Sequence, residues 1–232
     1  MTTTTKLKCS RELLDSIQHD TINLSHEDIE TALNGDADKA ATLCFRMNGS
    51  NRGYWAVKFG MERLMHPKAY RSFLENAWDH DHQHVQNTAF SYGVITDKYD
   101  PEYNEDSLDG CFTLMESNLK QCFEYAAFPI PADLPETLTI YRGCYRLNAI
   151  DTACGFSWTL SKKTGEWFAK RVPFRDVFAV AHIGSSDGPT LVKTTIKRED
   201  VAMFTNGREE QEIVTFAVDL QNIEEIEVSN DN

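Results

Sequence analysis

The sequence contains no apolar run as long as a membrane-spanning helix, which needs about 20 residues. Residues 1–8 are rich in threonine and lack the apolar stretch that a secretory signal peptide carries. We therefore expect a cytoplasmic protein that does not cross a membrane.

Paired cysteines and a glycine-rich nucleotide motif are also missing. The six cysteines are spread along the chain without a CxxC pair, which favours reduced thiols over a disulfide framework or a zinc site. No GxGxxG fingerprint is present, so a Rossmann dehydrogenase is not supported. His80 and His84 lie one helical turn apart, but no third cluster completes a metal site. We expect no metal cofactor.

Basic residues are scarce. The chain has 23 lysines and arginines against 36 aspartates and glutamates, which gives a formal net charge of -13. So acidic a protein does not attract polyphosphate over its whole surface, which weighs against a nucleic-acid partner. A local basic groove would not be visible in this total, so such a partner stays open.

The two halves of the chain differ in their hydrophobic pattern. Residues 1–130 have apolar positions at helical spacing, whereas residues 131–232 contain short β-type runs. Pro129, Pro131 and Pro135 stiffen the segment where the pattern changes. We predict an α+β fold: a helical region at 1–130 that could bind a substrate or partner, and a β core at 131–232 that carries the chemistry.

Local signals place individual elements. Ser25 to Asp28 is typical of a capped helix start, Asn34-Gly35 of a helix end, and residues 48–51 of a turn. We predict further helices at 54–65, 67–84, 108–125 and 164–170. In the last of these helices, Trp167 and Phe168 should face inward. We predict a loop at 96–109 and a hairpin turn at 184–188. The predicted strands are 137–141, 155–160, 177–183, 191–196, 212–218 and 223–228.

The first motif with chemical meaning is Arg142-Gly143, at the end of a predicted strand. A guanidinium is a planar, permanently charged fork that suits a phosphate, and glycine lets a ligand approach the backbone. Taken alone, the pair is better explained as a surface arginine at a strand end.

The second motif is Ser157-Trp158-Thr159. Alternate residues of a strand face the same side, so the Ser157 and Thr159 hydroxyls can reach one cleft. An ordinary strand with two hydroxyls on one face would give the same pattern.

The third motif places three glutamates within residues 209–212, directly before an apolar strand. Glu210 and Glu212 are two positions apart, so they share one face of an extended segment. Like charges held together shift each other's pKa, a cost that working sites often tolerate. A solvated acidic loop would also account for these glutamates.

In this order, the three motifs resemble the arginine, Ser-Thr-Ser and Glu-x-Glu elements of the ADP-ribosyltransferase family related to clostridial toxins and arginine-specific transferases. Residues 197–212 are similar to that family's acceptor-recognition loop, which joins two strands and ends at the catalytic glutamate. The resemblance covers about residues 134–228. It implies a split antiparallel β core that binds NAD in a cleft.

The resemblance also implies a role for each motif residue. Arg142, with Gly143, would hold the phosphates of NAD, and Ser157 would shape the nicotinamide pocket. Glu212 would hydrogen-bond a hydroxyl of the nicotinamide ribose, and Glu210 would orient or deprotonate the acceptor.

Further residues would complete these two sites. Tyr141, Trp158 and Thr159 would contact NAD, while Phe204 and Asn206 would recognise the acceptor. The chain departs from the family pattern at Trp158 and Thr159, which replace the last two residues of Ser-Thr-Ser. The departure concerns the shape of the pocket more than the activity.

The chemistry explains this set of groups. Cleavage between nicotinamide and ribose generates an oxocarbenium-like sugar, as glycoside hydrolysis does. A fixed carboxylate stabilises the developing positive charge, and a second carboxylate can act as the general base for the nucleophile. The site therefore needs one phosphate anchor and two carboxylates with different tasks.

The resemblance implies an NAD-dependent mono-ADP-ribosyltransferase, and the Glu-x-Glu form favours a protein arginine as acceptor. A nucleic-acid base stays open as acceptor, in a toxin or defence effector. Three further functions stay open: an NAD or ADP-ribose binding module without transfer activity, an NAD glycohydrolase, and an interaction protein that uses its acidic surface. An inhibitor or antitoxin protein is a candidate partner for the helical region.

Overall fold

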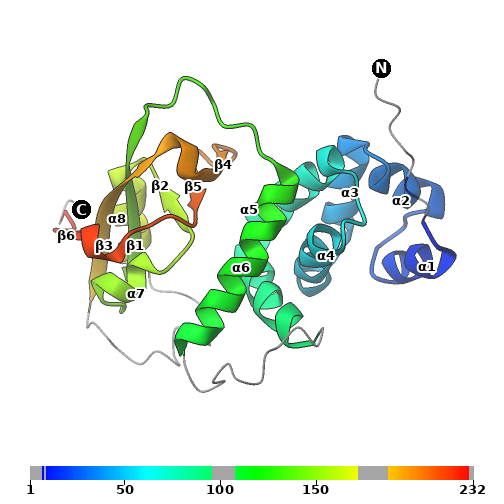
Figure 1. Cartoon of the computed structure of the whole chain (residues 1–232), viewed down its shortest axis with the longest axis horizontal. Coiled ribbons are helices and arrows are strands. Elements are labelled where there is room, and N and C mark those ends of the chain that lie inside the picture. The colour runs from blue at the N-terminus through cyan, green and yellow to red at the C-terminus, as the bar shows by residue number, and fades with distance from the viewer. Residues whose placement is uncertain (1–6, 8, 96–107, 172–187, 230–232) are drawn as a thin grey trace. The chain divides into compact units, whose positions relative to one another are not determined.

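A computed structural model describes residues 7, 9–95, 108–171 and 188–229. The chain forms two compact units, Met1–Phe128 and Pro129–Asn232, so the boundary follows Phe128 rather than residue 130. The first unit is helical and the second is built on an antiparallel sheet (Figure 1), which confirms the predicted α+β class. Among the helices of the described residues, none combines the length and apolarity of a membrane span.

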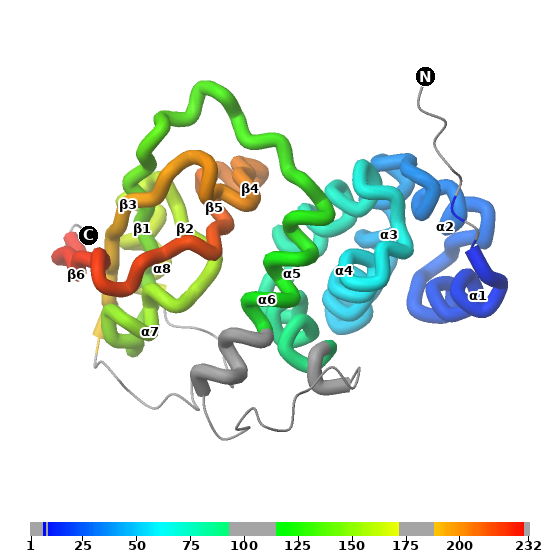
Figure 2. The backbone as a smooth tube through the Cα atoms, in the orientation of Figure 1, coloured from blue at the N-terminus to red at the C-terminus, as the bar shows by residue number. Residues whose placement is uncertain are grey.

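The helical unit is organised around three helices that pack against one another, α4, α5 and α6, and their path can be followed in Figure 2. Its core includes the fully buried side chains of Trp55, Phe59, Tyr70 and Phe73. The described helices are α1 Arg11–His19, α2 His26–Leu33, α3 Ala37–Arg46, α4 Gly49–Glu62, α5 Pro67–Ile95 and α6 Leu108–Ala126.

Helix α2 begins and ends where the sequence signals predict. The Ser25 hydroxyl accepts a hydrogen bond from Asp28 N at 3.1 Å, and Ser25 N donates to Asp28 Oδ2 at 3.4 Å, which forms a capping box. At the other end Asn34 caps the helix, and Gly35 adopts a φ of 118°.

Helix α4 starts earlier than predicted. The Asn48 side chain accepts from Asn51 N at 3.0 Å and caps a helix that begins at Gly49. The predicted turn at 48–51 was therefore wrong, because these polar residues form the N-cap and first turn of α4. The helix ends at Glu62, where Arg63 takes a left-handed φ of 55°.

Helix α5 spans Pro67–Ile95 and consists of two helical segments that meet at a kink. Asp81 has φ -164° and ψ 71°, which interrupts the helical path. Its Oδ1 accepts from His84 N at 3.1 Å, so Asp81 caps a second helical segment. The first segment therefore ends close to the predicted helix end at His84, and the second segment was not predicted.

The second unit contains a sheet with the strand order β4-β5-β2-β1-β3-β6, and every pair of neighbours is antiparallel. The three-stranded halves β4-β5-β2 and β1-β3-β6 meet through the residue pair Tyr141↔Thr159. The strands are β1 Thr137–Tyr145, β2 Ser157–Thr159, β3 Pro189–Lys197, β4 Val201–Thr205, β5 Glu212–Thr215 and β6 Glu224–Ile226, and the helices are α7 Ala149–Ala153 and α8 Lys162–Lys170.

Each predicted strand within the described residues is present with shifted ends, but one strand was missed. Strand β4, Val201–Thr205, lies inside the segment 197–212 that resembles an acceptor loop, and it pairs with β5. The predicted strand 177–183, nearly all of the turn 184–188 and most of the loop 96–109 lie outside the described residues.

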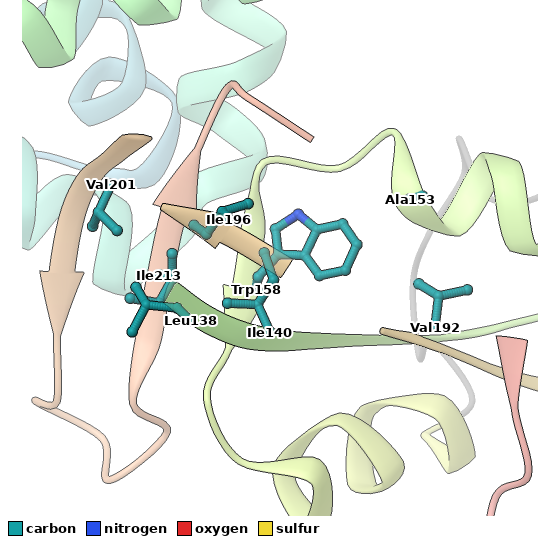
Figure 3. Close-up of a cluster of buried hydrophobic side chains, with 8 residues drawn as sticks. All are labelled: Leu138, Ile140, Ala153, Trp158, Val192, Ile196, Val201 and Ile213. Carbon is teal, nitrogen blue, oxygen red and sulfur yellow. The ribbon is translucent and has the colours of Figure 1, made fainter. Parts of the chain in front are cut away.

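An apolar core covers one face of the sheet (Figure 3). Trp158 is 2% exposed and packs there with Ile140 and Ile213, while its indole nitrogen donates to Gly155 O at 2.8 Å. Trp158 therefore serves the core, which corrects the expectation that it contacts a cofactor.

Helix α8 packs on the opposite face of the sheet through small residues. A Cβ on Gly143 would lie 1.9 Å from Gly165 O, so only glycine allows this approach of α8 to β1. Ala169, one turn after Gly165, is fully buried. Trp167, expected to face inward, is 52% exposed, because the helix needs small residues where it touches the sheet.

Candidate active site

The Arg142 guanidinium binds the backbone that leads into β2. Its Nε donates to Thr152 O at 2.8 Å, and its Nη1 donates to Ser157 O. A Cβ on Gly155 would lie 2.1 Å from Arg142 Cζ, so the guanidinium rests directly against this glycine. These two bonds use two of the five N–H donors of a guanidinium. Arg142 therefore fixes the position of the Ser157 strand.

Ser157 and Glu212 bring the second and third motifs together. Strands β2 and β5 are neighbours, and Thr159 lies opposite Glu212 in the register. Ser157 Oγ donates to Glu212 Oε1 at 2.5 Å, and Glu212 is only 4% exposed. A hydroxyl that donates to a carboxylate fixes the direction of that carboxylate. Glu212 is therefore held in place by the strand beside it.

The loop 206–211, which joins β4 to β5, holds Glu210 between two residues in the left-handed region. Glu209 has a φ of 59° and Gln211 a φ of 49°. Each such residue costs about 1–2 kcal/mol when it is not glycine. Strain of this kind persists only where neighbouring contacts enforce it, and it gathers at functional sites.

Contacts on both sides of Glu210 enforce the loop conformation. The Thr159 hydroxyl donates to Glu210 O at 2.5 Å, so β2 holds the backbone of Glu210 directly. Asn206 Oδ1 accepts from Gln211 N at 3.1 Å, which closes the loop across its two ends. The hydroxyl of Thr159 is thus engaged with the loop backbone, although it shares a face with Ser157 as predicted.

Charges surround the Glu210 carboxylate. Burial raises the pKa of Glu210, the neighbouring Arg208 lowers it, the negative charge of Glu212 raises it, and Arg171 lowers it. The pKa of Glu210 is raised overall. Arg208 Nη2 lies 3.1 Å from Glu210 Oε2 and 3.6 Å from Glu212 Oε2. One guanidinium therefore faces both carboxylates.

The remaining predicted residues lie in different surroundings. Gly143 is covered by α8, so helix packing, rather than the approach of a ligand, explains this glycine. Tyr141 is half-buried under α8 on the same face as Thr159. Phe204 lies in β4 instead of a loop and packs against the apolar core, whereas Asn206 is exposed at the start of the loop.

Two arginines near Glu210 were not predicted. Arg208 lies two positions before Glu210 and four positions before Glu212. The alternation along an extended segment that places the two glutamates on one face therefore also places Arg208 on that face. Arg171 follows α8, and its guanidinium lies 4.9 Å from the centre of the exposed Trp167 ring. Nothing in the sequence pattern connects Arg171 with Glu210, because their proximity depends on how α8 packs.

A cavity of about 340 Å³ lies in the helical unit, lined by residues of α4 and α5. Its polar groups bind one another: Lys58 Nζ lies 3.2 Å from Tyr54 OH and 3.4 Å from Glu62 Oε1, and Tyr92 OH donates to Glu62. None of the residues predicted from the three motifs lines this cavity.

Comparisons with protein-family models, curated proteins and solved structures give no match for this chain. Within the described part of the chain, no group of three or more His, Cys, Asp or Glu side chains could hold a metal ion.

Proposed function

We propose that the chain is an NAD-dependent mono-ADP-ribosyltransferase whose active site surrounds Glu212. The hydrogen bond of 2.5 Å from Ser157 Oγ to Glu212 Oε1 carries the proposal. It joins two motifs that lie 55 positions apart in the sequence. Arg142, the first motif, bonds to the carbonyl oxygen of the same Ser157. The resemblance requires that the three motifs lie together at one site. Three motifs that matched the family by chance would not be expected to be joined by hydrogen bonds.

The sheet also supports the proposal. The resemblance implies a split antiparallel core, and the two halves of this sheet meet through the pair Tyr141↔Thr159. Ser157, Thr159 and Glu212 share one face beside that junction, opposite the apolar core. Helix α8 packs on part of this face, so the nucleotide site that we propose is the part beside Ser157, which is half-buried.

The two carboxylates fit two different tasks. Glu212 is buried and fixed by Ser157, so it can bind a ribose hydroxyl and stabilise positive charge on the sugar as nicotinamide leaves. Glu210 is more exposed, with 22% of its side chain accessible, and its raised pKa suits a general base. Arg142 bonds to the backbone of Ser157 and so positions the strand that holds Glu212.

A protein arginine is the acceptor that this site fits best. Arg208 Nη2 already lies 3.1 Å from Glu210 Oε2, so the position beside the proposed base accommodates a guanidinium. A carboxylate pair recognises such a fork by charge and by hydrogen bonds. The formal net charge of -13 also suits a basic protein segment better than a polyphosphate.

Incubation with NAD labelled in its adenylate half, in the presence of cell extract, tests the proposal. We expect label in the protein fraction with wild type and with Glu209→Gln, an exposed glutamate of the same loop, but a rate about 10²–10³ lower with Glu212→Gln. Label in nucleic acid would keep the reaction and change the acceptor. If no fraction is labelled and no nicotinamide is released, the enzyme proposal fails, and NAD binding without turnover would favour a binding module.

A further inference from the structure

The cavity of about 340 Å³ in the helical unit lies between two points where α4 and α5 touch. At one end, a Cβ on Gly53 would lie 2.7 Å from His84 O, so the two backbones are in contact. At the other end, Tyr92 OH donates to Glu62. Between these contacts each helix runs for about 12–14 Å, at 1.5 Å per residue. The cavity is therefore large enough for a small molecule, since such sites start at about 300 Å³.

The wall of this cavity is polar, and helix packing does not explain that composition. Side chains that helices turn toward each other in a globular unit are normally apolar and fill the space between them. None of the described residues that line this cavity is aliphatic, and five of them carry a hydroxyl: Ser50, Tyr54, Thr88, Ser91 and Tyr92. Such a wall is suitable for a ligand with many hydrogen-bonding groups.

Four of the lining side chains form one chain of polar contacts that crosses from α4 to α5. Lys58 Nζ lies 3.2 Å from Tyr54 OH and 3.4 Å from Glu62 Oε1. Tyr92 OH donates to the same oxygen of Glu62. Lys58 Nζ also lies over the Tyr54 and Trp55 rings, 5.5 Å and 5.9 Å from their centres. These contacts hold Lys58 and Glu62 in position without a ligand.

Lys58 and Glu62 keep hydrogen-bonding capacity beyond these contacts. An ammonium group has three N–H donors, and the two contacts of Lys58 use two of them. Glu62 contacts Lys58 and Tyr92 through Oε1, so its Oε2 can accept a further hydrogen bond. His84, the other basic group of the wall, is paired with Asp81. Because both basic groups face a carboxylate, the cavity suits an uncharged ligand better than an ion.

We propose that this cavity binds a sugar ring through two neighbouring hydroxyls. Glu62 Oε2 accepts from one hydroxyl, and Lys58 Nζ donates to the next. The apolar face of the ring packs against the ring of Tyr54, which is 38% exposed. Free sugars and the ribose of a nucleoside both carry such a pair of hydroxyls. The site lies within the helical unit and does not rest on the proposed transferase activity.

An NMR titration of the isotope-labelled full chain with three ligands tests the proposal. Adenosine and methyl α-mannoside carry neighbouring hydroxyls on a ring, whereas 2′-deoxyadenosine lacks the pair. We expect adenosine or the mannoside to shift amide signals of α4 and α5, and the one that binds identifies the source of the sugar. If adenosine binds, 2′-deoxyadenosine should bind at least about tenfold more weakly, because Glu62 or Lys58 then loses a partner.

Glu62→Gln and Lys58→Met remove the two charged groups in turn, and each should raise Kd at least about tenfold. Glu124→Gln, which changes an exposed glutamate of α6, is the matched control and should leave Kd unchanged. Equal binding of 2′-deoxyadenosine and adenosine would overturn the inference. So would shifts that are confined to the β unit, a Kd that neither Glu62→Gln nor Lys58→Met changes, or no shift with any of the three ligands. None of these outcomes bears on nicotinamide release.

Discussion

Glu210 and Glu212 carry the same carboxyl group two positions apart, yet their surroundings differ. Glu212 is 4% exposed and receives a hydrogen bond from Ser157, whereas Glu210 lies at the tip of a strained loop beside Arg208. The sequence motif predicted that both carboxylates act at one site. It could not assign the difference between them, because burial and ion pairing depend on strands β2 and β4.

The raised pKa of Glu210 predicts the direction of the pH dependence. A protonated Glu210 cannot accept the proton of the acceptor, so transfer should fall as pH drops through the raised pKa and recover above it. Arg208 lowers this pKa, so Arg208→Ala should move the acid limb of the profile to higher pH.

The profile can be measured as the transfer rate to a small guanidino acceptor between mildly acidic and neutral pH. Glu210→Gln should remove the acid limb and most of the transfer while nicotinamide release continues. An acid limb that moves to lower pH in Arg208→Ala would contradict the assignment of Glu210 as the base.

Among the helices and strands, the sequence predicted the features that depend on neighbouring residues in the chain. The capping box at Ser25 and the strand register that brings Ser157 and Thr159 to one face follow from nearby residues. The kink at Asp81 and the edge strand Val201–Thr205 were missed. Both depend on contacts from elsewhere in the fold, which a pattern of apolar and polar residues does not record.

The loop 206–211 depends on Asn206, which we interpret as a positioning residue. Asn206→Ala removes the acceptor for Gln211 N, a hydrogen bond worth about 0.5–1.5 kcal/mol. We expect kcat for transfer to fall about two- to tenfold, since about 1.4 kcal/mol corresponds to a factor of ten. Nicotinamide release should change less, because Glu212 is held by Ser157.

Asn206→Asp provides the matched control, since it keeps an acceptor oxygen at the same place. Its transfer rate should stay near that of wild type. An equal loss in both variants would show that the amide contacts the acceptor directly, as the resemblance implies for Asn206.

At the scale of the whole molecule, each unit has its own buried core. Phe73 is fully buried in the helical unit, and Ile140 is fully buried in the β unit, where its cluster contains only residues of that unit. The change from a helical to a β pattern near Pro129 predicted this division, because each half must bury its own apolar face.

Two cores predict two unfolding transitions. Phe73→Ala should destabilise the helical unit by about 3–5 kcal/mol, and Ile140→Ala the β unit by about 2–5 kcal/mol. Calorimetry should show each substitution shifting a different transition. A single transition that both variants shift equally would mean that the units unfold together.

The release of free nicotinamide by purified protein tests whether Glu212 promotes the loss of nicotinamide from NAD. We expect release by wild type and by Glu209→Gln, and a rate about 10²–10³ lower for Glu212→Gln at unchanged folding. Release by Glu212→Gln at the wild-type rate, or none by wild type with or without a guanidino acceptor, would contradict it.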